Sequence, residues 1–109
     1  MGLRKIPLRN GQCYHIFTRS ISKYVIFNNA REYDRIIQLI NIQRFIDFDL
    51  PYSKFDRMKD ESKFTLAEYL KLTSKTYVDI ITYCLMSTHI HLLLKQNINN
   101  GITLHMMNI

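Results

Sequence analysis

The sequence has few of the residues and segments that mark special protein classes. Its only two cysteines, Cys13 and Cys84, accompany no secretion signal, so a disulfide framework is not expected and both thiols are predicted to be buried within strands. No apolar run approaches the roughly 20 residues that a membrane-spanning helix needs. Repeats and low-complexity segments are also missing. We therefore expect one soluble, cytoplasmic domain over residues 1–109 with no membrane partner.

Acidic residues are in the minority. Nine Asp and Glu stand against 15 Lys and Arg, which gives a net charge of +6 and a pI near 9.5. A hydrophobic fraction of 47% argues against a disordered chain. The charge favours an anionic partner, and nucleic acid is the commonest one, but a globular domain that is merely basic is an equal alternative.

The strongest pattern lies between residues 78 and 95. Two runs rich in aliphatic and β-branched residues flank Ser87 and Thr88, which predicts a buried β-hairpin. Alternation along the second strand separates the aliphatic side chains of Ile90, Leu92 and Leu94 from the imidazoles of His89 and His91. Residues two apart in a strand are about 6.6 Å apart at Cα, so both imidazoles can lean toward one metal ion.

The remaining elements are predicted from alternation, caps and turns. Residues 12–20 alternate and predict a first strand, central in the sheet. His15 is expected to be a core histidine, and the alternative is that it approaches the His89 and His91 pair if the two strands are neighbours. Asn29, followed by Glu32, predicts a helix start. Its apolar side would carry Tyr33, Ile36, Ile37, Ile40 and Phe45.

Residues 47–75 mix charges of both signs and are expected to form a surface insertion with one short helix. Thr65 would cap this helix with Glu68, Phe64 would staple onto Tyr69, and the helix would end near Leu72. Residues 96–101 predict a polar turn, and a further helix would begin at Gly101.

A His-x-His pair alone also fits a structural role, with both imidazoles satisfied by the backbone. Zinc hydrolases with this spacing need an Asp two residues on, where Leu93 stands, and a cupin-like site needs a Glu where only Lys95 and Gln96 follow. A structural zinc site needs two further ligands, and the cysteines are not expected beside the pair. Two histidines completed by a phosphate oxygen suit Mg²⁺ or Mn²⁺ in phosphoryl transfer.

Three stretches together resemble the single-tyrosine HUH transposases of insertion sequences, including the REP-associated branch. They are Tyr-His-Ile-Phe-Thr-Arg at 14–19, Tyr-Cys-Leu-Met-Ser-Thr-His-Ile-His-Leu-Leu-Leu-Lys at 83–95, and the helix start at Gly101-Ile102. The family usually has Pro-Asn where this chain has Ser87-Thr88. The resemblance implies an α+β, ferredoxin-like antiparallel sheet with helices packed on one face. It also implies DNA transposition by a homodimer, with single-stranded DNA carrying hairpin ends as substrate.

The resemblance also implies a site. His89 and His91 would bind Mg²⁺ or Mn²⁺, and a tyrosine on the helix that begins at Gly101 would attack the phosphate to form a 5′-phosphotyrosine link. That tyrosine is expected beyond Ile109, and none of the seven tyrosines present occupies its place. We therefore expect no catalytic residue in this chain, which would be a truncated, inactive transposase that keeps metal and DNA binding. The cations expected to contact DNA are Arg4, Lys5, Arg9, Arg19 and Lys95.

Two rival functions remain open at this point. A ferredoxin-like module that binds single-stranded nucleic acid without chemistry would bind equally well in EDTA. A small metal-dependent phosphoesterase that uses water would cleave DNA repeatedly without a covalent product.

Overall fold

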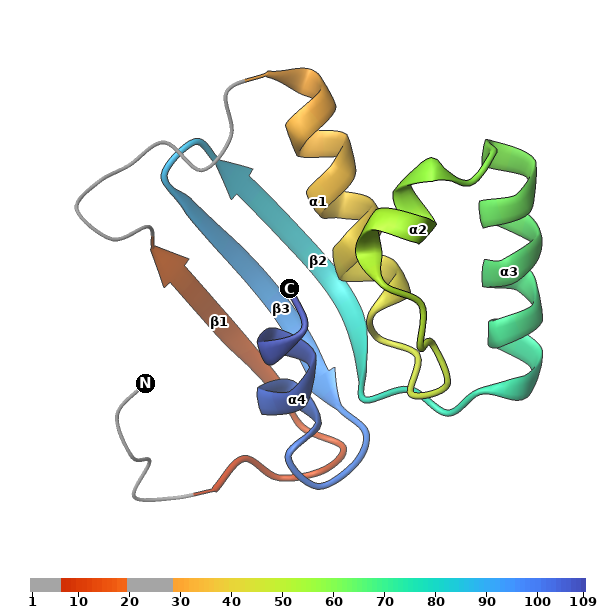
Figure 1. Cartoon of the computed structure of the whole chain (residues 1–109). Coiled ribbons are helices and arrows are strands. Elements are labelled where there is room, and N and C mark those ends of the chain that lie inside the picture. Colours follow the sequence, from red (N-terminus) through yellow and green to blue (C-terminus); the bar gives the residue numbers. More distant parts are fainter. Residues whose placement is uncertain (1–6, 20–28) are drawn as a thin grey trace.

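A computed structural model describes residues 7–19 and 29–109 of the chain. Its strands are β1 (Cys13–Arg19), β2 (Val78–Met86) and β3 (His89–Gln96). Its helices are α1 (Ala30–Ile42), α2 (Tyr52–Arg57), α3 (Asp60–Thr73) and α4 (Gly101–Met107) (Figure 1). The predicted α+β class is confirmed.

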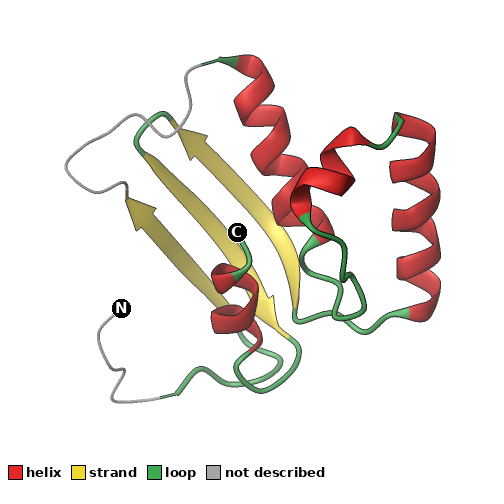
Figure 2. Cartoon of the chain, in the orientation of Figure 1, coloured by secondary structure: helices red, strands yellow, loops and turns green. Residues whose placement is uncertain are grey.

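The strands form one antiparallel sheet in the order β1-β3-β2 (Figure 2). β3 pairs with both neighbours, so β1 and β2 run parallel to each other on either side of it. Within the described sheet β1 is therefore an edge strand, and the prediction that it would be central is wrong. The order β1-α1-β2-β3-α4, with α2 and α3 between α1 and β2, follows the first five elements of the βαββαβ ferredoxin-like motif.

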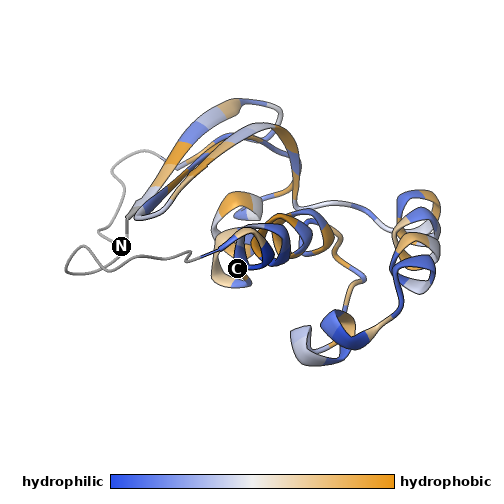
Figure 3. Cartoon of the chain, turned by 90° about the horizontal axis from the view of Figure 1, so that it is seen from above, coloured by the Kyte–Doolittle hydropathy of each residue, from blue (hydrophilic) through white to orange (hydrophobic). Residues whose placement is uncertain are grey.

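Alternation along β3 divides the sheet into a covered face and an open face. Ile90, Leu92 and Leu94 are buried, whereas the residues between them are only partly buried. Ile40 of α1 and Ile102 of α4 belong to the same core as these residues. Helices α1 and α4 thus lie on one side of the sheet, and no helix of the described chain lies on the other (Figure 3).

The predicted hairpin between β2 and β3 and the predicted start of the first helix are confirmed. Two residues, Ser87 and Thr88, join β2 to β3. The Asn29 side chain accepts a hydrogen bond from the backbone N–H of Glu32 at 3.0 Å and caps α1. Phe45 lies outside this helix, which ends at Ile42, and forms an isolated β-bridge with Thr76.

Residues 47–75 contain two helices where one was predicted; the predicted end of the longer helix near Leu72 is confirmed, and its predicted start is wrong. α3 begins at Asp60, five residues before the expected cap, and ends at Thr73. Thr65 does not cap the helix, because it lies inside it and its hydroxyl donates to the Glu61 carbonyl at 2.9 Å. Phe64 is 68% exposed and does not form the predicted hydrophobic staple. Acidic residues at the start of α3 complement the positive end of its dipole, which explains why the charged stretch is helical.

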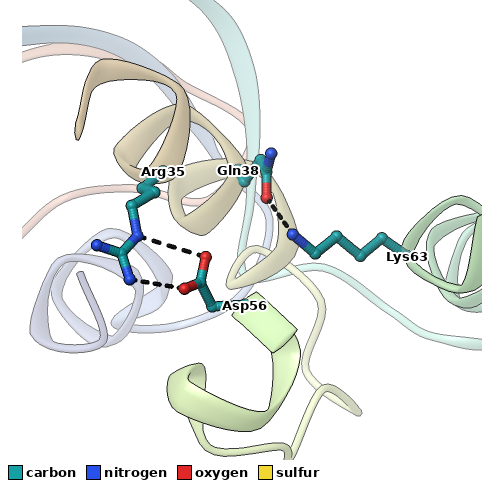
Figure 4. A network of polar contacts seen from close by, with 4 residues as sticks. All are labelled: Arg35, Gln38, Asp56 and Lys63. Atoms are coloured by element: carbon teal, nitrogen blue, oxygen red, sulfur yellow. Dashed lines mark hydrogen bonds and ion pairs between the residues drawn. The ribbon is translucent and has the colours of Figure 1, made fainter. Parts of the chain in front are cut away.

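A second apolar cluster holds α2 and α3 near the end of α1. Its buried residues are Ile42, Phe45, Phe55 and Leu70. Two polar contacts join the same helices (Figure 4). Arg35 of α1 pairs with Asp56 of α2 at 2.6 Å, and the Lys63 ammonium of α3 donates to the Gln38 side chain at 3.0 Å. The Arg35 guanidinium lowers the pKa of the Asp56 carboxyl.

The contact between α4 and α1 depends on a buried histidine. His105 is fully buried, and its Nε2 donates to the Ile40 carbonyl at 2.9 Å. Its Nδ1 has no hydrogen-bond partner among the described residues. Burial lowers the pKa of His105, and the charge of Arg44 acts in the same direction, although the hydrogen bond to Ile40 opposes them.

This environment predicts an acid-sensitive fold. Because the folded pKa of His105 lies below the unfolded value near 6.5, the unfolded chain binds protons more strongly. The stabilisation is complete above the unfolded pKa and is lost as the pH falls toward the folded pKa. Urea midpoints at pH 7.5 and pH 5.0 check this expectation. The difference between them should shrink in His105→Gln, and an unchanged difference would assign the pH dependence to other groups.

Candidate metal and nucleic-acid site on the open sheet face

The open face of the sheet gathers the chemistry that the sequence suggested. Residues that stand opposite each other across neighbouring strands project to the same side. The strand register brings Phe17 of β1 and Cys84 of β2 to either side of His91 on β3. The same face also carries Cys13, His15, Met86, His89, Leu93 and Lys95.

His89 and His91 lie where the alternation predicts. Both side chains are partly buried, and their ring centroids are 5.2 Å apart with an interplanar angle of 79°. Nδ1 of His89 is 3.1 Å from the hydroxyl of Thr88, which leaves Nε2 as its second ring nitrogen. Each ring can therefore offer a nitrogen at the open face.

His15 joins this pair, and the prediction that it would be a core histidine is wrong. It is exposed, and its Nε2 lies 2.9 Å from Nδ1 of His91. The two rings are nearly parallel, with centroids 5.1 Å apart. The apolar neighbours Tyr14 and Ile16, which pack against the core, were the sequence signal that His15 points the other way.

Phe17 is a site residue that sequence reasoning missed. Its ring centroid lies 4.9 Å from that of His91 and 5.5 Å from that of His89. The side chain is nevertheless 45% exposed, which is unusual for a phenylalanine in a strand. An exposed aromatic ring beside imidazoles is a surface on which a nucleobase can stack.

Both cysteines are free and exposed, so the prediction that they would be buried is wrong. They lie in the expected strands, but on the face that neither α1 nor α4 covers. Cys84 stands directly across from His91, although a cysteine was not expected beside the histidine pair. Strand alternation alone does not reveal which face of a sheet the helices cover.

The surroundings of His91 favour its neutral imidazole form. Partial desolvation lowers the pKa of His91, and charge on His15 or His89 would lower it further. Neutral imidazole is the form that binds a metal ion, because the coordinating nitrogen must have its lone pair free. His91 is therefore prepared for coordination at neutral pH.

The imidazole nitrogens of His89 and His91 fit a metal ion that leaves some of its coordination positions to other ligands. In the part of the chain that the structure describes, no group of three or more His, Cys, Asp or Glu side chains is arranged to hold a metal ion. An ion at His89 and His91 would thus take further ligands from water or from a phosphate oxygen. Mg²⁺ and Mn²⁺ commonly bind in this way at phosphoryl-transfer sites.

The structure describes three of the five basic residues expected to contact DNA. Lys95 shares the open face and stands across from Cys13 and Asp79. Arg9 is exposed just before β1, where its backbone N–H donates to the Tyr14 hydroxyl at 2.8 Å. The backbone of Arg19 pairs with His89 at the far end of β1. Arg4 and Lys5 lie outside the described residues.

Comparisons with protein-family models, with curated proteins and with solved structures found no match to this chain. Over the two described ranges, no helix has the length and apolar character needed to cross a membrane.

Proposed function

We propose that this chain is the DNA-binding and metal-binding part of a transposase of the single-tyrosine HUH type. The observation that carries the proposal is the cluster of His15, His89 and His91 around the exposed ring of Phe17, on a sheet face that no described helix covers. A divalent ion held by His89 and His91, Mg²⁺ or Mn²⁺, would neutralise charge on a bound phosphate.

Single-stranded DNA with hairpin ends is the proposed ligand. An open sheet face with an aromatic ring suits unpaired bases, which stack on aromatic side chains, better than a closed duplex. The net charge of +6 adds attraction for the phosphate backbone at low salt. Action as a homodimer, and a place in the cytoplasm, are part of the same proposal.

We further propose that the chain does not itself form a covalent link to DNA. Tyr14 and Tyr77 pack against the core on the covered side, and Tyr83 stands across from Leu92 on that same side. Tyr69 lies on α3, which is set apart from the sheet (Figure 1). Within residues 7–19 and 29–109, the register therefore brings no tyrosine to the histidine face.

A DNA-binding and adduct assay tests the proposal. A labelled pool of single-stranded hairpins is titrated with the chain in Mn²⁺ and in EDTA, and a parallel sample is run on a denaturing gel. We expect binding that weakens about tenfold in EDTA or in His91→Ala, with no covalent band. Thr18→Ala is the matched control, because Thr18 is exposed in β1 on the opposite face.

Other outcomes separate the rival functions. Binding that ignores both EDTA and His91→Ala would identify a nucleic-acid module without a metal role. Repeated cleavage without an adduct would identify a phosphoesterase that uses water. A covalent band lost in His91→Ala would show that one of the tyrosines present attacks DNA, which contradicts the proposed inactivity.

A further inference from the structure

A crevice between α1 and α3 is separate from the histidine cluster. All of its lining residues come from α1, α2, α3 and the two residues at 44 and 45. Its volume is about 410 Å³, which is enough for a small organic ligand. Ile42, Phe45 and Phe55 line it and are each only 3% exposed, so they form an apolar floor. Phe64 lines the crevice from α3 and is 68% exposed, so its ring is open to a ligand.

Positive charge predominates around this apolar floor. The charged side chains that line the crevice are three cations and one carboxylate, namely Arg44, Lys63, Lys71 and Asp60. The Arg44 guanidinium lies 4.3 Å from the ring centroid of Phe45, and the Lys63 ammonium lies 5.3 Å from that of Phe55. Two of the cations are therefore in contact with the aromatic rings of the floor.

These two cations have no carboxylate partner. Among the described residues, the ion pairs include neither Arg44 nor Lys63, whereas Lys71 is paired with Glu68 at 2.9 Å. The Lys63 ammonium reaches across the crevice and donates to the Gln38 side chain, a neutral acceptor, at 3.0 Å (Figure 4). Its other N–H groups remain for a further acceptor. Because both cations are partly buried, an anion bound between α1 and α3 would offset their loss of solvation.

Two side-chain amides complete the lining. Gln38 and Asn41 of α1 lie along the crevice, and Asn41 uses its amide nitrogen to donate to the Ile37 carbonyl at 2.9 Å. Its amide oxygen is then available as an acceptor. Amides recognise the edges of nucleobases, aromatic rings stack on their faces, and cations bind phosphate. The lining thus has a group for each part of a nucleotide.

We propose that the crevice between α1 and α3 binds a nucleoside monophosphate. The base lies against Phe64 and the apolar floor, and the phosphate contacts Arg44 and Lys63. This inference goes beyond the proposed function, because it requires neither a metal ion nor any residue of the histidine face. The nucleotide is either free or an unpaired unit of a nucleic-acid strand, since both present the same base and phosphate.

Titration of the whole ¹⁵N-labelled chain with dAMP, followed by NMR, tests the inference. EDTA is present to remove metal from the histidine face. We expect saturable shifts of backbone amides at the end of α1 and along α3. Arg44→Gln and Lys63→Gln should each weaken binding about tenfold, and Phe64→Ala about fivefold. Deoxyadenosine, which lacks the phosphate, should bind more weakly than dAMP and should not distinguish Arg44→Gln from the wild type.

A matched control and a second ligand give the other outcomes. Lys75→Gln removes one charge from an exposed position outside the crevice and should bind dAMP as the wild type does. Tighter binding of a four-residue deoxyadenosine strand at the same amides would identify the strand as the source, and equal binding a free nucleotide. The absence of shifts at α1 and α3 with both ligands, or equal losses in Lys75→Gln and Lys63→Gln, would overturn the inference. Shifts confined to β1 and β3 would also overturn it but would leave the proposed function intact.

Discussion

Replacing Gly101 with alanine is expected to destabilise the fold by about 3 kcal/mol or more, because overpacking against backbone cannot be relieved by a side-chain rotation. Gly101 opens α4 and is buried against the preceding loop. A Cβ placed there would lie closer than 3.0 Å to the carbonyl oxygen of Tyr77 and 3.1 Å from its carbonyl carbon. That oxygen already accepts a hydrogen bond from the Asn97 N–H at 3.0 Å, so it is not free to move.

Urea denaturation of Gly101→Ala measures this effect, and Gly11→Ala is the matched control. Gly11 has a φ of +81°, but nothing lies within 4 Å of its added Cβ. Alanine there meets only the backbone preference against left-handed conformations, which is about 1–2 kcal/mol. We expect Gly101→Ala to lower the urea midpoint clearly more than Gly11→Ala does. Equal losses would show that α4 can shift away from Tyr77.

Replacing Gln96 with leucine is the second large expected loss, at about 3 kcal/mol. Gln96 is only 1% exposed, and its side chain joins the segment before β1 to the start of α4. Its amide nitrogen donates to the Leu8 carbonyl at 3.0 Å and to the Asn10 side chain at 3.1 Å, while its amide oxygen accepts from the Ile102 N–H at 3.2 Å. Leucine fills the space but leaves the buried N–H of Ile102 without its partner.

Gln12→Leu is the control for this variant. Gln12 is exposed and pairs with Gln96 only through the backbone, where its carbonyl accepts from the Gln96 N–H at 3.0 Å. Its replacement should change the free energy of unfolding by less than about 0.5 kcal/mol. Amide hydrogen exchange gives a second readout, because the Ile102 N–H should lose protection in Gln96→Leu alone. Retained protection would mean that Gln96 does not fix the start of α4.

Local patterns in the sequence determined the hairpin, the start of α1 and the faces of β3. The alternation of Ile90, Leu92 and Leu94 with His89 and His91 is a property of any strand, so it predicts which side chains share a face. The cap at Asn29 needs only a side chain three residues from the N–H that it satisfies. Such signals depend on neighbours in the chain, and they can be read before the fold is known.

Contacts between distant segments decided the rest. His15 and His91 meet, and Cys84 stands beside His91, because β3 lies between β1 and β2 and because α1 and α4 cover only one side of the sheet. Gln96 was expected in a polar turn. It is buried instead, and its side-chain amide donates to the Leu8 carbonyl and accepts from the Ile102 N–H. The sequence by itself therefore determined the strand that carries His89 and His91 and the face they share. Only the tertiary structure decided that a third imidazole lies within hydrogen-bond distance of His91, since strand order and helix placement depend on long-range packing.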